Sequence, residues 1–115
     1  MIFTSDNTRI TPAEKEKQTM ITEFKKYYIK AGFADEKNIQ SWEFKSVSKV
    51  NNPNRQDYYK FEGTFSCKDK GYECLYISQV DDPIDGKYTY PFTFYVKVKE
   101  NNGNYTFSDV SDYLG

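Results

Sequence analysis

Residues 89–110 constrain the fold of this chain more than any other part of the sequence. Large apolar side chains occupy every second position from Tyr90 to Val98, which is the pattern of a strand with one buried face. Asn102 and Gly103 follow this strand, and both tolerate the positive φ that the two central positions of a type I′ turn require. The sequence therefore predicts a hairpin with a two-residue turn.

The turn also predicts which residues of the hairpin face one another. Counted outward from it, the expected pairs are Asn101 with Asn104, Lys99 with Thr106, Val98 with Phe107 and Val96 with Asp109. The apolar face of the first strand thus continues onto the return strand through Phe107, and Tyr95 is expected on the opposite face.

Residues 11–31 predict one amphipathic helix of about twenty residues. Thr11 is the expected N-cap, with Pro12 at the first helical position and Glu14 completing a capping box. Gly32 is expected to end the helix in a left-handed conformation, with Phe33 folding back on the last turn. The apolar residues at helical spacing are Met20, Ile21, Phe24, Tyr27, Tyr28 and Ala31.

Three further segments are predicted to be strands, at residues 40–50, 59–67 and 72–80. The third has apolar residues on both faces and is expected to be either a central strand or one that is covered on both sides. Strands joined by hairpins pair antiparallel, and the helix is the element able to cover their apolar face. We therefore expect an α+β fold in which one N-terminal helix packs on a curved antiparallel sheet of four to five strands. Residues 1–10 are expected to form a flexible leader and residues 11–115 a single domain.

Cys67 and Cys74 flank the turn-forming sequence KDKGYE and are the expected disulfide pair. If Lys70 and Gly71 are the central residues of the turn, the two cysteines face each other across an antiparallel pair. If Asp69 joins them in a three-residue loop with a glycine bulge, the cysteines point to opposite faces. We favour the bonded register and hence an oxidising compartment, with two free thiols in a cytosolic protein as the alternative.

Charge and composition argue against several classes of function. The 16 basic and 17 acidic residues are mixed along the chain, so no basic surface for nucleic acid or an anionic membrane is predicted. No apolar run approaches the roughly 18 residues that span a bilayer. Without histidine, the chain lacks the ligands of a structural zinc site. In the acidic loop at residues 81–86, Pro83 stands where a calcium-binding loop needs an oxygen ligand. We expect no metal and no cofactor.

A group of tyrosine and aliphatic residues is expected on the sheet face that the helix leaves open. Tyrosine on such a face is a frequent protein-contact residue because it is large, rigid and amphipathic. The alternative is that these tyrosines only reflect strand propensity and lie in cross-strand pairs. The candidate partner surface consists of Tyr58, Leu75, Ile77, Tyr88 and Tyr95.

The predicted order of elements is one helix followed by strands linked through hairpins. Its segments are TPAEKEKQTMITEFKKYYIKAGF, QSWEFKSV, DYYKFEGTFSC, YECLYISQV and TYPFTFYVKVKENNGNYTF. It resembles the cystatin-like and nuclear transport factor 2-like folds. Within these it is similar to small exported domains of Gram-positive bacteria, including cystatin-like lipoproteins and scaffold domains of conjugation machines. The Q-x-V-x-G inhibitory loop of cystatins is absent, since Gln79 and Val80 are followed by two aspartates and a proline. Protease inhibition by that loop is therefore not expected.

The expected function is a non-catalytic, extracytoplasmic protein-interaction or assembly domain of a bacterial surface lipoprotein or transfer machine. Its partner would be another protein or a second copy, bound through the open sheet face. The protein would be secreted or lipid-anchored, or cytoplasmic if Met1 is the native start. The alternative is a small-ligand-binding or enzymatic domain with a pocket between helix and sheet, in which Asp, Glu, Lys or Tyr would do the acid-base work. The sequence singles out no such catalytic pair.

Overall fold

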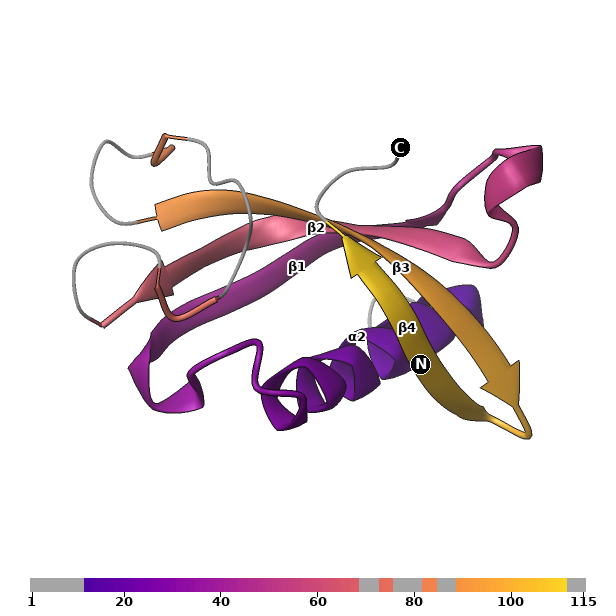
Figure 1. The fold of residues 1–115 in the computed structure, drawn as a ribbon, viewed down its shortest axis with the longest axis horizontal. Coiled ribbons are helices and arrows are strands. Elements are labelled where there is room, and N and C mark those ends of the chain that lie inside the picture. Colours follow the sequence, from indigo (N-terminus) through magenta and orange to yellow (C-terminus); the bar gives the residue numbers. More distant parts are fainter. Residues whose placement is uncertain (1–11, 69–72, 76–81, 85–88, 112–115) are drawn as a thin grey trace, which may run out of the picture.

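The computed structural model describes residues 12–68, 73–75, 82–84 and 89–111. Within these residues one helix, α2 (Pro12–Lys30), precedes a four-stranded antiparallel sheet in the order β1-β2-β3-β4. The strands are β1 (Ile39–Lys49), β2 (Tyr58–Cys67), β3 (Thr89–Asn101) and β4 (Asn104–Ser111), with the short 3-10 turns η1 (Glu36–Asn38) and η2 (Pro53–Arg55) before β1 and β2. The predicted α+β arrangement of one helix on an antiparallel sheet is confirmed (Figure 1).

The end of α2 is built as predicted. Gly32 has a φ of +86°, and its N–H donates to the carbonyl of Ile29 at 3.0 Å. The N–H of Phe33 reaches back to the carbonyl of Tyr28, also at 3.0 Å, and the two rings lie 5.3 Å apart. These two hydrogen bonds form a Schellman motif, which provides donors for carbonyl groups in the last turn of the helix. The predicted N-cap, Thr11, lies outside the described residues.

The hairpin between β3 and β4 has the predicted turn and the predicted register near it. Asn102 and Gly103 have φ values of +55° and +83°, as a type I′ turn requires. Three of the predicted pairs are present: Asn101 with Asn104, Lys99 with Thr106 and Val98 with Phe107.

Farther from the turn the register changes, because β4 contains one extra residue. Lys97 pairs with Ser108 but Tyr95 pairs with Ser111. Asp109 lies at this bulge with a φ of +54°. The predicted pairing of Val96 with Asp109 is therefore wrong, because the bulge interrupts the ladder at that point.

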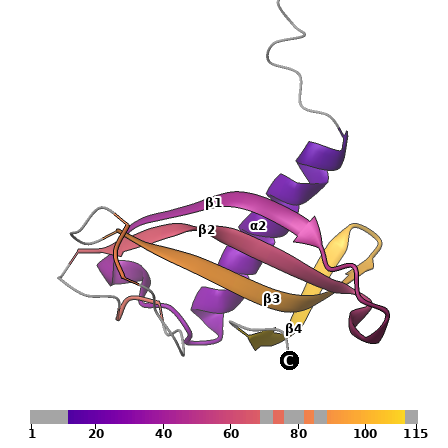
Figure 2. The same cartoon turned by 90° about the horizontal axis from the view of Figure 1, so that it is seen from above.

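The core lies between α2 and one face of the sheet, and Phe24 is at its centre. Its ring stacks on Phe61 at 4.8 Å and lies 5.6 Å from Phe94 and 5.4 Å from Phe107. Figure 2 shows α2 crossing behind β1, β2 and β3 on that face. The outer strands β1 and β4 come closest to the helix, whereas large aromatic side chains separate it from the central strands. The sheet therefore curves around the helix, as expected.

Gly63 of β2 lies against the backbone of β1. A Cβ atom at this position would lie 1.9 Å from the backbone oxygen of Glu43 and 2.8 Å from the ring of Phe92. No side chain fits there, which explains a glycine in the middle of a buried strand.

Residues 73–75, the described part of the segment predicted as a third strand, do not belong to a strand of the sheet. β2 pairs with β1 along one edge and with β3 along the other, so no strand lies between β2 and β3. Within residues 73–75, Leu75 forms an isolated antiparallel bridge with Ala34, in the connection between α2 and β1. Residues 76–80 lie outside the described part of the chain. Apolar residues on both faces indicate burial on both sides. Leu75 is buried, but it packs against a connecting segment and not inside a sheet.

Candidate functional site

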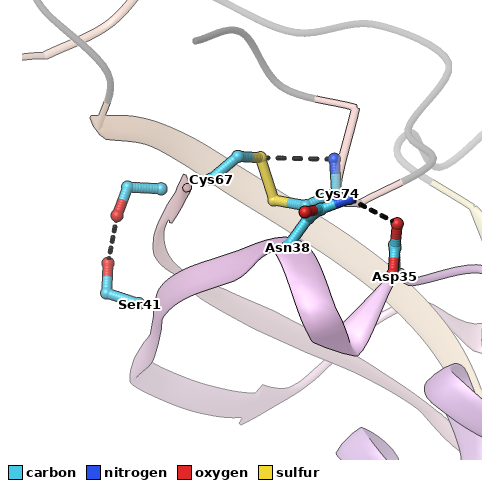
Figure 3. Close-up of a disulfide and its surroundings, with 6 residues drawn as sticks. Asp35, Asn38, Ser41, Cys67 and Cys74 are labelled. Atoms are coloured by element: carbon cyan, nitrogen blue, oxygen red, sulfur yellow. Dashed lines mark hydrogen bonds between the residues drawn. A yellow bond between two sulfur atoms is a disulfide. The ribbon is translucent and has the colours of Figure 1, made fainter. Parts of the chain in front are cut away.

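The predicted disulfide between Cys67 and Cys74 is present, with the two Cα atoms 5.6 Å apart (Figure 3). The N–H of Cys74 donates to Sγ of Cys67 at 3.2 Å, and the carbonyl of Cys74 accepts from the N–H of Asp35 at 2.8 Å. Asn38 reinforces the same corner, because its side-chain amide donates to the carboxylate of Asp35 at 2.6 Å. The disulfide thus joins the end of β2 to Cys74 in the segment between β2 and β3, and Cys74 in turn is hydrogen-bonded to the connection between α2 and β1. The two alternative turns proposed for residues 69–71 lie outside the described residues.

Two members of the predicted partner surface are buried, so their assignment to an exposed surface is wrong. Leu75 is 1% exposed, because the bridge to Ala34 places it in the core. Tyr58 pairs with Lys97 on the outer face of the sheet but is only 9% exposed. Its hydroxyl donates to the carboxylate of Asp109, and the guanidinium of Arg55 lies 5.7 Å above its ring.

The hydrogen bond to Asp109 changes the chemistry of Tyr58 as well as its exposure. This bond, followed by burial and by the negative charge of Asp109, raises the pKa of the Tyr58 hydroxyl. The positive charge of Arg55 acts in the opposite direction but does not cancel it. Tyr58 therefore serves to hold the β4 bulge in place and is not available as a contact residue.

Tyr95 is the member of the predicted surface that the structure places on the outer face with partial exposure. The ammonium of Lys60 lies 5.8 Å from its ring centre. Ile77 and Tyr88 lie outside the described residues. Around Tyr95 the outer face is mainly polar, and the described residues that share it include Ser41, Glu43, Ser48, Lys60, Glu62, Thr64, Ser66, Thr93 and Lys97. A partner surface there was expected to be apolar, but the outer face of the described strands is not.

A different surface combines aromatic residues with a cavity. We call it the α2–β4 groove; its volume is about 390 Å³, it is open to solvent, and its lining residues are Glu23, Lys26, Tyr27, Lys30, Tyr105, Thr106 and Phe107. The ring of Tyr27 lies 5.6 Å from that of Phe107, so the two form a continuous aromatic wall. Tyr27, Tyr105 and Phe107 are each only partly buried. Sequence reasoning assigned Tyr27 and Phe107 to the core and named no residue of a groove.

The edge of β4 that faces away from β3 runs beside this groove. In a two-residue hairpin, the residues that flank the turn form a hydrogen-bonded pair and the next pair does not. Tyr105 and Phe107 therefore direct their backbone N–H and C=O groups away from β3. Val98, which lies opposite Phe107, shows the same alternation. Its N–H points away from β4 and donates to the carbonyl of Asp57 at 2.8 Å on the other side of β3. In the described part of the chain no strand pairs with this edge of β4.

Charge changes sign along the groove. Glu16 and Glu100 lie near Tyr105; burial raises the pKa of its hydroxyl most, and these two carboxylates raise it further. Lys26 and Lys30 line the groove beside Tyr27, and Lys26 forms an ion pair at 3.5 Å with Glu23, which lines the groove on the side toward Glu16. At a rise of about 1.5 Å per residue, Lys30 lies about 21 Å from Glu16 along the helix axis. The groove thus has an acidic end and a basic end.

Comparisons with known protein families, with curated proteins and with solved structures found no match to this chain. Within the described ranges, no helix combines the length and apolar character needed to cross a membrane. The same residues contain no group of three or more His, Cys, Asp or Glu side chains able to hold a metal ion.

Proposed function

We propose that this protein is a non-catalytic interaction or assembly domain that binds an extended segment of a protein partner in the α2–β4 groove. The observation that carries the proposal is an edge of β4 with which no strand of the described residues pairs, beside a partly exposed aromatic wall. Strand addition uses this combination, since backbone hydrogen bonds along the edge give affinity and side-chain pockets give specificity. The proposal keeps the function expected from sequence but moves its surface from the outer sheet face to the groove.

We place this domain outside the cytoplasm, secreted or lipid-anchored at the cell surface. The bond between Cys67 and Cys74 supports this location, because structural disulfides persist in oxidising compartments and are rare in the cytosol. The resemblance to exported cystatin-like lipoproteins and conjugation scaffolds leads to the same proposal, in which the domain serves assembly at a bacterial surface.

A small ligand is the alternative occupant of the same groove. A volume of about 390 Å³ is within the range of small-molecule sites, and Lys26, Tyr27 and Tyr105 offer groups for binding or acid-base chemistry. Small-molecule sites, however, usually enclose most of the ligand's surface, whereas this groove is open along one side. An extended polypeptide that also pairs with β4 fits an open groove better.

The test replaces Tyr105 by the photo-cross-linking residue p-benzoylphenylalanine, with the same replacement at Tyr95 on the outer face as the control. The purified protein is irradiated alone and with a library of random peptides, and the adducts are identified by mass spectrometry. We expect polypeptide adducts from position 105 and few from position 95. The absence of adducts at position 105 under both conditions would refute the proposal. Adducts only at position 95 would return the site to the outer face.

A further inference from the structure

We propose that the occupant of the α2–β4 groove is a second copy of this chain, with the two β4 strands paired antiparallel across a twofold axis. This inference rests on the proposed function, because it names the partner of the same site. Its two supports are the geometry of the free strand edge and the order of charges along the groove.

The backbone geometry of β4 allows a symmetric pairing. An interface on a twofold axis must be self-complementary, so each contact occurs twice. If Thr106 lies on the axis, Tyr105 of each copy faces Phe107 of the partner subunit. These are the residues whose N–H and C=O groups point away from β3. Each pair can then exchange both hydrogen bonds, and the two sheets become one continuous sheet.

The length of this pairing is limited by the bulge. Asp109 departs from strand geometry, with a φ of +54°, and is held there by the hydroxyl of Tyr58. The regular edge therefore extends from Asn104 to Ser108. Such a short ladder is not enough by itself, so the side chains along the groove must supply the remaining affinity and the specificity.

The charge order along the groove is self-complementary. Antiparallel pairing places the acidic end of one copy, with Glu16 and Glu100, beside the basic end of the other, with Lys26 and Lys30. The reverse contact occurs at the other end of the same interface. An unrelated peptide would need this order of charges by coincidence, whereas a second copy carries it necessarily. These four charged side chains are exposed, so salt should weaken the association.

The test exchanges the charges at the two ends separately. The first variant combines Glu16→Lys with Glu100→Gln, where glutamine keeps the acceptor for the N–H of Gly103. The second combines Lys26→Glu with Lys30→Glu. All four side chains are exposed, so both variants should fold, which circular dichroism checks. Lys99→Glu is the matched control, because Lys99 lies on the outer face of the same hairpin.

Sedimentation equilibrium then measures the association of each protein. We expect the native chain and the Lys99→Glu control to dimerise at low salt, and each charge variant alone to dimerise roughly tenfold or more weakly. A mixture of the two charge variants should regain dimer formation, because a basic groove then meets an acidic one.

Three results would overturn the second copy as the occupant: a native chain that stays a 13.6 kDa monomer at all concentrations, a dimer that neither variant weakens, or a mixture that does not recover. The photo-cross-linking experiment separates these failures from a failure of the proposed function. Peptide adducts at position 105 in a chain that does not dimerise would retain the groove as a protein-binding site and reject self-association. No adducts at that position would reject both proposals.

Discussion

Tyr58 illustrates how a single residue can be correctly placed on a sheet face and still have an unexpected role. It alternates away from the core face, as its position in the strand predicts, and pairs with Lys97 on the outer face. Asp109, fifty-one positions away in sequence, accepts its hydroxyl hydrogen bond. This contact buries the ring and fixes the β4 bulge at the same time. A residue that appeared suited to binding a partner is used to shape the strand edge instead.

The raised pKa of Tyr58 predicts a pH dependence of stability. The folded-state pKa lies above the ordinary value of 10.0, so the native state holds this proton more tightly than the unfolded state does. The stabilisation is fully present below about pH 10 and is lost as the pH rises through the folded-state pKa. Tyr58→Phe should lower the urea midpoint at neutral pH and reduce its decline above about pH 10. Urea titrations across this range measure both effects.

Tyr95→Phe is the matched control for that experiment, since it removes a hydroxyl from the same sheet face. An equal reduction of the alkaline decline in Tyr95→Phe would contradict the role assigned to the Tyr58 hydrogen bond. Retention of the full decline in Tyr58→Phe would contradict it as well.

At the scale of elements, the disulfide joins segments that the sheet does not hold together. Cys67 ends β2, whereas Cys74 receives the N–H of Asp35 from the connection that follows α2. Leu75 then fills the space beside Ala34. One covalent bond therefore anchors the start of the segment between β2 and β3 against the helical layer of the domain.

Loss of this disulfide should destabilise the contact between Cys74 and the connection after α2, and leave the sheet intact. The double variant Cys67→Ala with Cys74→Ala should lower the free energy of unfolding by about 2–3 kcal/mol, because the closed loop is short. Amide hydrogen exchange should accelerate at Asp35, whose N–H donates to the carbonyl of Cys74. The N–H of Val98, which donates to Asp57 far from the disulfide in sequence, provides the internal reference. Equal acceleration at both amides, after correction for global stability, would argue against a local anchor.

At the scale of the whole molecule, a single aromatic core on one side of the sheet determines where binding can occur. Phe24, Phe61, Phe65 and Phe94 are at most 2% exposed, so the space between helix and central strands is filled by side chains. The aromatic layer becomes partly exposed at the side of the sheet formed by β4, where Tyr105 and Phe107 meet Tyr27. The groove is thus the open margin of the core and not a separate structure.

Truncation of the core and of the outer face should have very different costs. Phe24→Ala removes a fully buried ring that contacts both the helix and the sheet, and should destabilise the fold by about 3–5 kcal/mol. Tyr95→Ala on the outer face should cost far less, within about 1 kcal/mol. Chemical denaturation of the two variants measures the difference. A similar loss of unfolding free energy in both variants would mean that packing on the outer face stabilises the fold as much as packing in the core.

The predicted residues of the core face were mostly right, whereas two of the five residues predicted for the partner surface, Tyr58 and Leu75, are buried. Phe61, Phe65 and Phe94 are buried as the alternation predicts, because side-chain direction in a strand follows from position alone. The groove combines residues of α2 with residues of β4 that lie some eighty positions later. Tyr27 and Phe107 belong to predicted apolar faces, but their partial exposure depends on where the helix ends its contact with the sheet.

The sequence alone determined the features that depend on neighbouring residues. The turn at Asn102 and Gly103 and the helix end at Gly32 and Phe33 follow from φ preferences and short-range hydrogen bonds. Tertiary structure decided the direct pairing of β2 with β3, the burial of Tyr58 and Leu75, and the groove beside β4. Each of these depends on contacts between segments far apart in the chain, and residue periodicity carries no information about which distant segment will cover a given side chain.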